Sequence, residues 1–194
     1  MRIIAGEAGG RRLKSIKGSS TRPTSDRIKE SLFNILSPYL PVGQGLDLFA
    51  GFGGLGIEAL SRGVARMTFV EKDVRNCKVL RENLAIAGFE KRGKLIRGDV
   101  FSFLKKTEDS FDLVLMDPPY QKDYVMEAMK LLLERDLLRK EGIIAVEHEG
   151  NLKLEQLRGL FLLKHKVYGD TALSVLKKGG RGIDAAGSCL SRQF

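Results

Sequence analysis

The sequence contains little cysteine and histidine, which limits the metal and redox chemistry to expect. Its 194 residues include two cysteines, Cys77 and Cys189, and two histidines, His148 and His165. The cysteines form no C-x-x-C pair and have no histidine nearby, so the sequence supports neither a zinc site nor a disulfide framework. We therefore expect no metal site, a core position for Cys77, and structural roles for both histidines.

The sequence also lacks any hydrophobic run of the roughly 18 residues that a membrane-spanning helix requires. Residues 1–14 contain too short an apolar segment for a signal peptide, and charges follow it. With 43% hydrophobic and 29% charged residues, the composition is typical of a soluble protein with one main domain. We expect a cytoplasmic protein, and a monomer because the sequence shows no coiled-coil or other dimer stripe.

Acidic residues are outnumbered, and the formal net charge is +9. Residues 1–22 carry six basic side chains against the single acid Glu7. Basic charge that neutralises phosphates gives affinity without sequence information, so this segment indicates a polyanionic partner such as nucleic acid. A solvated basic face is the alternative. The basic residues are Arg2, Arg11, Arg12, Lys14, Lys17 and Arg22.

Short apolar runs alternate with helical patterns from residue 45 onwards, which is typical of an α/β doubly wound fold. Five strand-helix units precede two final runs at residues 160–168 and 171–178, which are joined at Gly169 and Asp170 and should pair antiparallel. We predict a mostly parallel seven-stranded sheet with this terminal hairpin. One predicted helix covers residues 73–87, where apolar residues recur at spacings of three and four: Val74, Cys77, Leu80 and Leu84.

Residues 1–44 differ from the rest. They predict a small β-hairpin around Gly9 and Gly10, then an amphipathic helix within residues 24–36 that has Thr24 or Ser25 as its N-cap. We divide the chain into an N-terminal extension (1–44), the main domain (45–178) and a tail that we expect to be loosely ordered (179–194). The apolar face of the helix comprises Ile28, Leu32, Ile35 and Leu36.

A glycine-rich loop follows the first predicted strand. Gly51, Gly53 and Gly56 satisfy G-x-G-x-x-G between a strand and a helix, and glycines permit a tight turn close to a ligand. Glu71 lies 20 residues after Gly51 at the end of the next strand, where a carboxylate accepts hydrogen bonds from ribose hydroxyls. Because any adenosine ligand fits this pattern, it leaves NAD and S-adenosylmethionine open.

Two further acids at strand ends favour S-adenosylmethionine. Asp47 would repel a pyrophosphate but suits the charged amino-acid part of the methyl donor. Asp99 can accept a hydrogen bond from an adenine amino group, and Val100 can supply a backbone N–H. Strand ends are often polar for purely structural reasons, which is the alternative. The predicted cofactor-binding residues are Asp47, Phe49, Ala50, Gly51, Gly53, Gly56, Glu71, Lys72, Asp99, Val100 and Asp117.

Together these motifs resemble the RsmD family of 16S rRNA (guanine-N2)-methyltransferases. The resemblance spans roughly residues 1–178. The DPPY tetrapeptide alone is shared with DNA adenine methylases, so the N-terminal motif adds most of the specificity. Phe52 departs from the small serine more usual in the loop, and residues from Arg181 have no counterpart. The matching segments are RIIAGEAGGRRL, TRPTSDRIKESLFNIL, DLFAGFGGLGIEALSRG, VEKD, RGDV and MDPPY.

The resemblance implies methylation of the exocyclic N2 amine of a guanine in 16S rRNA, guanine 966, during or after small-subunit assembly. Asp117 and the carbonyl of Pro118 would accept hydrogen bonds from the two amino protons, and both Pro118 and Pro119 would stiffen this turn. Tyr120 would offer an aromatic face to a base removed from its stack. These four residues are the predicted catalytic set.

The resemblance also implies that the N-terminal extension faces the RNA. Arg27 could instead pair with Glu30 or Asp26 on the surface of its helix. The implied partner is 16S rRNA in the small ribosomal subunit. The predicted RNA-binding residues are Arg11, Arg12, Lys14, Lys17, Arg22, Thr24 and Arg27.

Three other functions stay open at this point. An adenine-N6 methyltransferase of DNA or RNA would share the core chemistry, although the sequence shows no separate target-recognition domain. A non-catalytic RNA-binding assembly factor could use the same fold as a scaffold. A nicotinamide enzyme fits the glycine loop but lacks an evident hydride-transfer partner and leaves DPPY unexplained.

Overall fold

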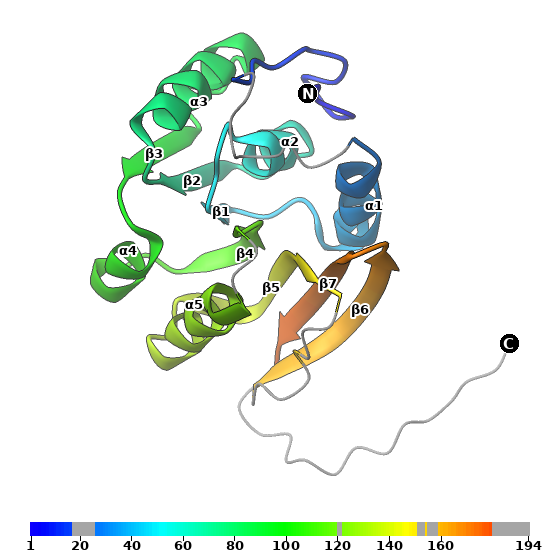
Figure 1. Cartoon of the computed structure of the whole chain (residues 1–194), viewed down its shortest axis with the longest axis vertical. Helices are drawn as coiled ribbons and strands as arrows, with labels where there is room; N and C mark the ends of the chain where they lie inside the picture. Colours follow the sequence, from blue (N-terminus) through cyan, green and yellow to red (C-terminus); the bar gives the residue numbers. More distant parts are fainter. Residues whose placement is uncertain (17–25, 120–121, 151–153, 155–158, 180–194) are drawn as a thin grey trace, which may run out of the picture.

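The computed structural model describes residues 1–16, 26–119, 122–150, 154 and 159–179. Within these ranges seven strands form one sheet in the order β3-β2-β1-β4-β5-β7-β6 (Figure 1). None of the helices in the same ranges is long and apolar enough to cross a membrane. The strands are β1 (Gln44–Leu48), β2 (Arg66–Glu71), β3 (Gly93–Arg97), β4 (Phe111–Met116), β5 (Leu138–Glu149), β6 (Leu160–Tyr168) and β7 (Thr171–Lys178). The helices are α1 (Asp26–Leu36), the 3₁₀ helix η1 (Ser37–Tyr39), α2 (Gly54–Ser61), α3 (Val74–Ala87), α4 (Val100–Lys106) and α5 (Lys122–Glu134).

The strand order confirms the predicted fold class. β1 lies between β2 and β4 and is parallel to both, whereas β7 pairs antiparallel with both β5 and β6. The chain therefore winds outward from β1 in two directions. In open α/β sheets ligands bind outside the carboxyl ends of the strands at such a switch point.

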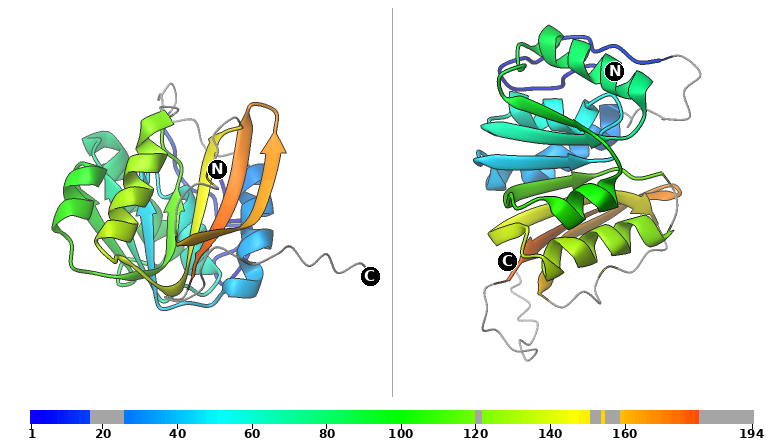
Figure 2. Two further views of the ribbon diagram at one scale, coloured as in Figure 1. Left: turned by 90° about the horizontal axis from the view of Figure 1, so that it is seen from below. Right: turned by 90° about the vertical axis from the view of Figure 1, so that its left-hand side faces the viewer.

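Helices cover both faces of the sheet (Figure 2). Two hydrophobic cores lie between these helices and the strands. On one face α1, α2 and α3 pack on side chains such as Phe69 and Leu115. On the other face α4 and α5 pack on side chains such as Val114 and Val146. Neighbouring strand residues alternate between the two cores because successive side chains of a strand point to opposite faces. The central strands are consequently buried on both sides.

Local sequence signals set the ends of α3. The Asp73 side chain accepts hydrogen bonds from the backbone N–H groups of Arg75 and Asn76, at 2.7 and 3.1 Å, and so caps the first turn. Gly88 ends the helix with a φ of 78°, a left-handed conformation that suits glycine. The predicted apolar face is wrong at Val74, which is 61% exposed and lies on the solvent side.

The first described residue of α1 is Asp26, and the predicted caps Thr24 and Ser25 lie outside the described residues. The predicted face is confirmed for Leu32 and Leu36, which are buried, while Ile28 and Ile35 are partly buried. Phe33 and, unexpectedly, Lys29 share the buried face. A lysine was not predicted there because helical periodicity alone does not reveal a buried partner for its charge.

The N-terminal segment forms less regular structure than the predicted hairpin. It contains one antiparallel bridge, between Arg2 and Arg12, together with a hydrogen bond of 2.9 Å from the Ile3 N–H to the Arg11 carbonyl. Its apolar residues pack into the core beside α1 and α2. This segment thereby belongs to the same packed unit as the sheet. The buried side chains are Ile3, Ala8 and Leu13.

Candidate active site

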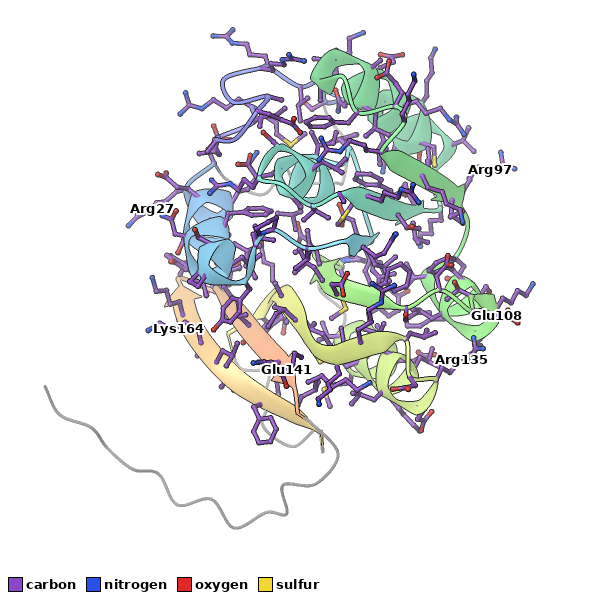
Figure 3. All side chains as sticks on the ribbon, turned by 180° about the vertical axis from the view of Figure 1, so that it is seen from behind. Arg27, Arg97, Glu108, Arg135, Glu141 and Lys164 are labelled. Atoms are coloured by element: carbon purple, nitrogen blue, oxygen red, sulfur yellow. The ribbon has the colours of Figure 1, made fainter. Side chains whose placement is uncertain are left out.

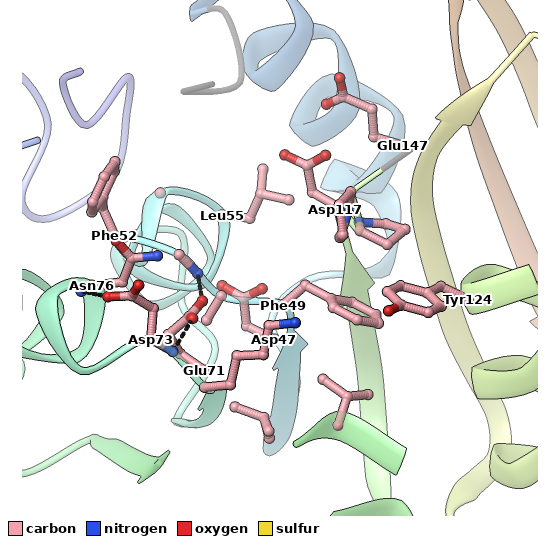
Figure 4. Close-up of a pocket in the computed structure, with 18 of the residues that line it drawn as sticks. Asp47, Phe49, Phe52, Leu55, Glu71, Asp73, Asn76, Asp117, Tyr124 and Glu147 are labelled. Carbon is pink, nitrogen blue, oxygen red and sulfur yellow. Dashed lines mark hydrogen bonds between the residues drawn. The ribbon is translucent and has the colours of Figure 1, made fainter. Parts of the chain in front are cut away.

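A cavity of about 1360 Å³ opens at the carboxyl ends of the parallel strands (Figure 4). Typical small-molecule pockets occupy about 300–1,000 Å³, so this cavity has room for more than one small ligand. Its wall runs from the ends of β2 and β3, across the loop after β1, to the ends of β4 and β5 and the β6–β7 turn. The cavity thus spans the switch point at β1, where the chain winds outward in two directions.

The loop after β1 is shaped by backbone conformations that favour glycine. Gly51 and Gly53 have φ values of 54° and 82°. A Cβ atom on Gly56 would overlap the Phe69 ring, so this glycine lets α2 approach β2 closely. Gly51 lines the cavity, whereas the lining does not include Gly53 or Gly56. These two therefore shape the loop, and a direct contact with a cofactor stays a prediction.

Glu71 ties this loop to the next strand. Its Oε2 accepts a hydrogen bond of 2.8 Å from the Gly51 N–H, and its Oε1 accepts one of 2.7 Å from the Asp73 N–H. The carboxylate is buried, yet it lines the cavity. Because each carboxylate oxygen accepts more than one hydrogen bond, Glu71 keeps capacity for a ligand hydroxyl.

Asp47 is the most deeply buried acid of the cavity, with 2% of its surface exposed. Its Oδ2 accepts a hydrogen bond of 2.8 Å from the Gly56 N–H. Burial raises the pKa of Asp47 to about 8, and the nearby charges of Asp117 and Glu71 act in the same direction, against the lowering effect of the Gly56 hydrogen bond. The site therefore favours a cationic ligand group that would restore the ionised form of Asp47.

Asp99 and Val100 form the wall after β3. The Asp99 side chain caps α4 by accepting a hydrogen bond of 2.8 Å from the Ser102 N–H. Lys72, also predicted, lines the rim and is exposed. The sequence reasoning missed Phe101, although its place just after the predicted Asp99–Val100 pair was a signal.

An aromatic cluster lines this part of the cavity. The Phe49 and Tyr124 rings stack with centroids 5.7 Å apart and an interplanar angle of 8°. Phe101 meets Tyr124 edge to face at 5.4 Å. Such a cluster offers a flat apolar surface beside the carboxylates. Tyr124 was missed because it belongs to α5, which follows the DPPY turn instead of a strand end.

Asp117, Pro118 and Pro119 follow β4 directly and line the cavity, and their catalytic role stays a prediction. Tyr120 lies outside the described residues. Beside Asp117, the end of β5 contributes Glu147, which the sequence reasoning also missed. Figure 4 shows the Asp117 and Glu147 side chains on the same side of the sheet as Leu55. An acid at the end of the fifth strand was the available signal.

The predicted RNA-binding residues are only partly brought together. The Arg11 guanidinium donates a hydrogen bond of 3.0 Å to the Ile86 carbonyl near the end of α3, while the Lys14 ammonium donates one of 2.8 Å to Glu82. Arg12 and Arg27 are exposed, and Arg27 points away from the molecule (Figure 3). Lys17, Arg22 and Thr24 lie outside the described residues.

The N-terminal segment and α1 nevertheless reach the cavity, because Met1 of the segment and Ile28 of the helix form part of its wall.

The histidines and Cys77 have the surroundings of structural residues. His148 and His165 both contact the Ser174 hydroxyl, at 2.8 and 2.9 Å, and Cys77 is fully buried. Among the residues that the structure describes, no group of three or more histidine, cysteine or acidic side chains is arranged to hold a metal ion.

The chain matches known proteins over most of its length. The family described as "Conserved hypothetical protein 95" matches residues 1–177. The chain is 40% identical over 184 residues to "Putative rRNA methyltransferase YlbH" of Bacillus subtilis, covering 93% of this chain and 100% of the relative. It is 35% identical to "Ribosomal RNA small subunit methyltransferase D" of Escherichia coli, covering 94% and 92%. A solved structure, "Putative methyltransferase yhhF from Escherichia coli", superposes with a TM-score of 0.83 at 34% identity and covers 93% and 99% of the two chains.

Proposed function

The chain belongs to the Conserved hypothetical protein 95 family of S-adenosylmethionine-dependent rRNA methyltransferases, and we propose that it methylates the N2 amine of a guanine in 16S rRNA. The proposed target is the guanine at position 966, in the assembling or assembled small subunit. The observation that carries the proposal is that Asp117 and Pro118 line the same cavity as the buried carboxylates Asp47 and Glu71.

The cavity residues at the ends of β1, β2 and β3 fit the methyl donor. Asp47 suits the ammonium of its amino-acid part, and Glu71 has acceptor capacity for ribose hydroxyls. Asp99 and the Val100 N–H suit the polar edge of adenine, and the aromatic cluster around Phe101 suits its apolar faces. Along the cavity wall, the groups that suit the amino-acid part, the ribose and the adenine follow one another at the ends of β1, β2 and β3. The three parts of S-adenosylmethionine are joined in the same order.

When bound, S-adenosylmethionine supplies a methyl group that is already strongly electrophilic, so the protein mainly has to position the nucleophile. The lone pair of an exocyclic amine is delocalised into the ring. Asp117 and the Pro118 carbonyl accept hydrogen bonds from the two amino protons and turn the nitrogen toward the methyl group. Asp117 also stabilises the positive charge that develops on the nitrogen, and the proton then leaves to solvent.

The RNA partner would meet the basic surface beside the cavity. Arg12 is exposed, and the solvent side of α3 presents Lys78 and Arg81 one turn apart. Arg11 and Lys14 bind to the far part of the same helix through Ile86 and Glu82. Together these basic groups could neutralise successive phosphates, which positions an RNA without reading its sequence.

The decisive experiment incubates the protein and labelled S-adenosylmethionine with small subunits from cells that lack this enzyme. The RNA is then digested to nucleosides and the labelled nucleoside is identified. We expect N2-methylguanosine at one site. Label in N6-methyladenosine would retain the mechanism but replace the target base, and the absence of label on both subunits and naked RNA would favour a non-catalytic binding factor.

A further inference from the structure

Glu147 is a cavity residue that the methyl-transfer chemistry described so far does not use. It stands near the carboxyl end of β5, its side chain is 7% exposed, and it lines the cavity. A carboxylate accepts hydrogen bonds, and in its ionised form it donates none, so an ionised Glu147 would select for hydrogen-bond donors. Its place in the cavity therefore raises the question of which N–H group it would recognise.

The sheet register places Glu147 beside the reaction centre. β4 and β5 are parallel, and Met116 is opposite Val146. The next residues along the two strands, Asp117 and Glu147, therefore leave the sheet on the same face, as Figure 4 shows. A base whose amine contacts Asp117 would present an adjacent edge atom to Glu147.

The total volume of the cavity is large enough for a base in addition to the methyl donor. Its volume of about 1360 Å³ exceeds the usual range for one small ligand. The donor-binding carboxylates Asp47, Glu71 and Asp99 come from the ends of β1, β2 and β3, whereas Glu147 lies beyond Asp117 toward β7. Leu55 and Tyr168 also line the wall near these strands and add apolar surface.

The ring atom next to the reacting amine differs between the two purines that carry an exocyclic amine. In guanine, N1 carries a hydrogen beside the N2 amine and is a donor. In adenine, N1 beside the N6 amine is an acceptor, and its lone pair would face the carboxylate. A site built to receive a donor discriminates strongly against an analogue that lacks it, by about 10⁴–10⁵-fold in favourable cases.

We propose that Glu147 accepts the N1–H of the target base and so makes the site select guanine over adenine. This inference rests on the proposed methylation of an exocyclic amine and adds the residue that chooses the base. It leaves both N2 protons to Asp117 and the Pro118 carbonyl. Glu147 is thus a base-recognition residue in direct contact with the substrate.

The test compares the protein with its Glu147→Gln variant on two kinds of small subunit. One kind carries the target guanine, located beforehand by the wild-type reaction, and the other carries adenine at that position. An amide accepts from N1–H through its oxygen and donates to an adenine N1 through its nitrogen. We expect the variant to methylate guanine about 10- to 100-fold more slowly, to label N6 of the adenine, and to lose at least about 100-fold of the guanine preference.

The matched control is Glu141→Gln near the opposite end of β5 (Figure 3), where the carboxylate is exposed. This carboxylate pairs with Lys177. This variant should keep the wild-type preference. A folded Glu147→Gln protein that binds the methyl donor normally but shows an unchanged preference, or that loses guanine activity without gaining any on adenine, would overturn the inference. A wild-type protein that labels no guanine at all would overturn the proposed function, and the inference with it.

A substrate-side measurement needs no variant. Subunits assembled in vitro with 2-aminopurine at the target position keep the reacting N2 amine but have no hydrogen on N1. The wild-type protein should methylate them at least about 100-fold more slowly than subunits with guanine. Equal rates would exclude recognition of N1–H and so contradict a role for Glu147 in base choice.

Discussion

Glu58 and Asp47 are both buried carboxylates of the same core, but their surroundings differ. Glu58 lies under the N-terminal segment, where its oxygens accept hydrogen bonds from the backbone N–H groups of Ile4 and Ala5, at 2.7 and 3.1 Å. Lys29 and Arg62 approach the same carboxylate at 3.5 and 2.8 Å. This group is internally balanced and complete without any ligand.

The cavity holds the opposite arrangement. Asp47, Glu71 and Glu147 are buried acids on its wall, and the pKa of Asp47 is raised because burial and two neighbouring carboxylates disfavour its ionised form. The cations that line the same cavity, Lys72 and Arg75, are exposed at its rim.

The comparison distinguishes a buried carboxylate that stabilises the fold, Glu58, from the buried carboxylates of the cavity, which we expect to bind a ligand. A buried carboxylate with two cations and two backbone donors holds elements together, as Glu58 holds the N-terminal segment against α1 and α2. Among the residues that the structure describes, the cations lining the cavity are exposed, and a gathering of buried carboxylates on a cavity wall is typical of functional sites. Glu58 thus forms a structural group, whereas binding and catalysis by the cavity acids are predictions that the following experiments test.

The largest expected effect follows from removing the centre of the structural group. Glu58→Ala would leave Lys29 buried without its carboxylate, so we expect a loss of about 3–5 kcal/mol in the free energy of unfolding. Urea denaturation measures this loss. Hydrogen exchange at the amides of Ile4 and Ala5 should also become faster, because their acceptor is gone.

The matched control for this change is Glu82→Ala. Glu82 pairs with Lys14 at 2.8 Å, but the Lys14 side chain is 60% exposed and the Glu82 side chain is 37% exposed, so solvent screens the pair. Stability should therefore be almost unchanged. Similar losses for the two variants would contradict the distinction between a buried structural group and surface ion pairs.

The second prediction tests the cavity side of the comparison. Asp117→Ala should lower kcat by about 10²–10³-fold, because the amine loses both an orienting acceptor and the charge that stabilises the transition state. Affinity for S-adenosylmethionine, measured by calorimetry, should change little, and the fold should persist. Equal losses in turnover and in cofactor affinity would mean that Asp117 mainly binds the cofactor.

The third prediction uses the raised pKa of Asp47. Its folded value of about 8 lies above its unfolded value of about 3.9, so the protonated acid adds stability that is present below the unfolded pKa and is lost as the pH rises through 8. The ligand-free Asp47→Asn variant should lack this loss and be more stable than the wild type at pH 9, by on the order of a few kcal/mol. Urea denaturation of the wild type and the variant at pH 6 and pH 9 measures how the free energy of unfolding of each protein changes with pH.

The same variant should bind S-adenosylmethionine more weakly, since the amide cannot pair with the ammonium group. Wild-type affinity should rise with pH toward 8, where Asp47 ionises more readily, and the variant should lack this dependence. If the variant is less stable at every pH and binds S-adenosylmethionine normally, Asp47 has a structural role and is not part of the cofactor site.

Sequence patterns predicted most of this fold because hydrophobic periodicity and strand-end motifs are local. The alternation of strands and helices, the terminal antiparallel hairpin and the positions of the glycine loop, Glu71 and Asp117 at strand ends all follow from short segments. The N-terminal hairpin was predicted too regular because the backbone around Gly6 and Gly10 turns with positive φ and leaves only one bridge.

What the sequence did not reveal depends on contacts between distant segments. Lys29 is buried because its ammonium forms an ion pair with Glu58, 29 residues later, and donates a hydrogen bond to the Arg2 carbonyl. Glu147 joins the site because β5 lies beside β4, although the residue stands outside every recognised motif. Both cases need the fold before the role of the side chain becomes visible.

The smallest effect is expected at exposed charges that belong to neither buried group. Arg12 is exposed, so neutralising it should not alter stability or turnover at saturating substrate. If it contacts an RNA phosphate, Arg12→Gln should weaken binding to 16S rRNA several-fold and reduce the slope of log K against log salt by about one. Arg66→Gln, a change of another exposed arginine at the start of β2, is the matched control. Equal salt slopes for the wild type and Arg12→Gln would exclude Arg12 from the RNA interface. A smaller salt slope in Arg12→Gln, with no change in Arg66→Gln, would show that solvent-exposed charge contributes to RNA affinity separately from both buried groups.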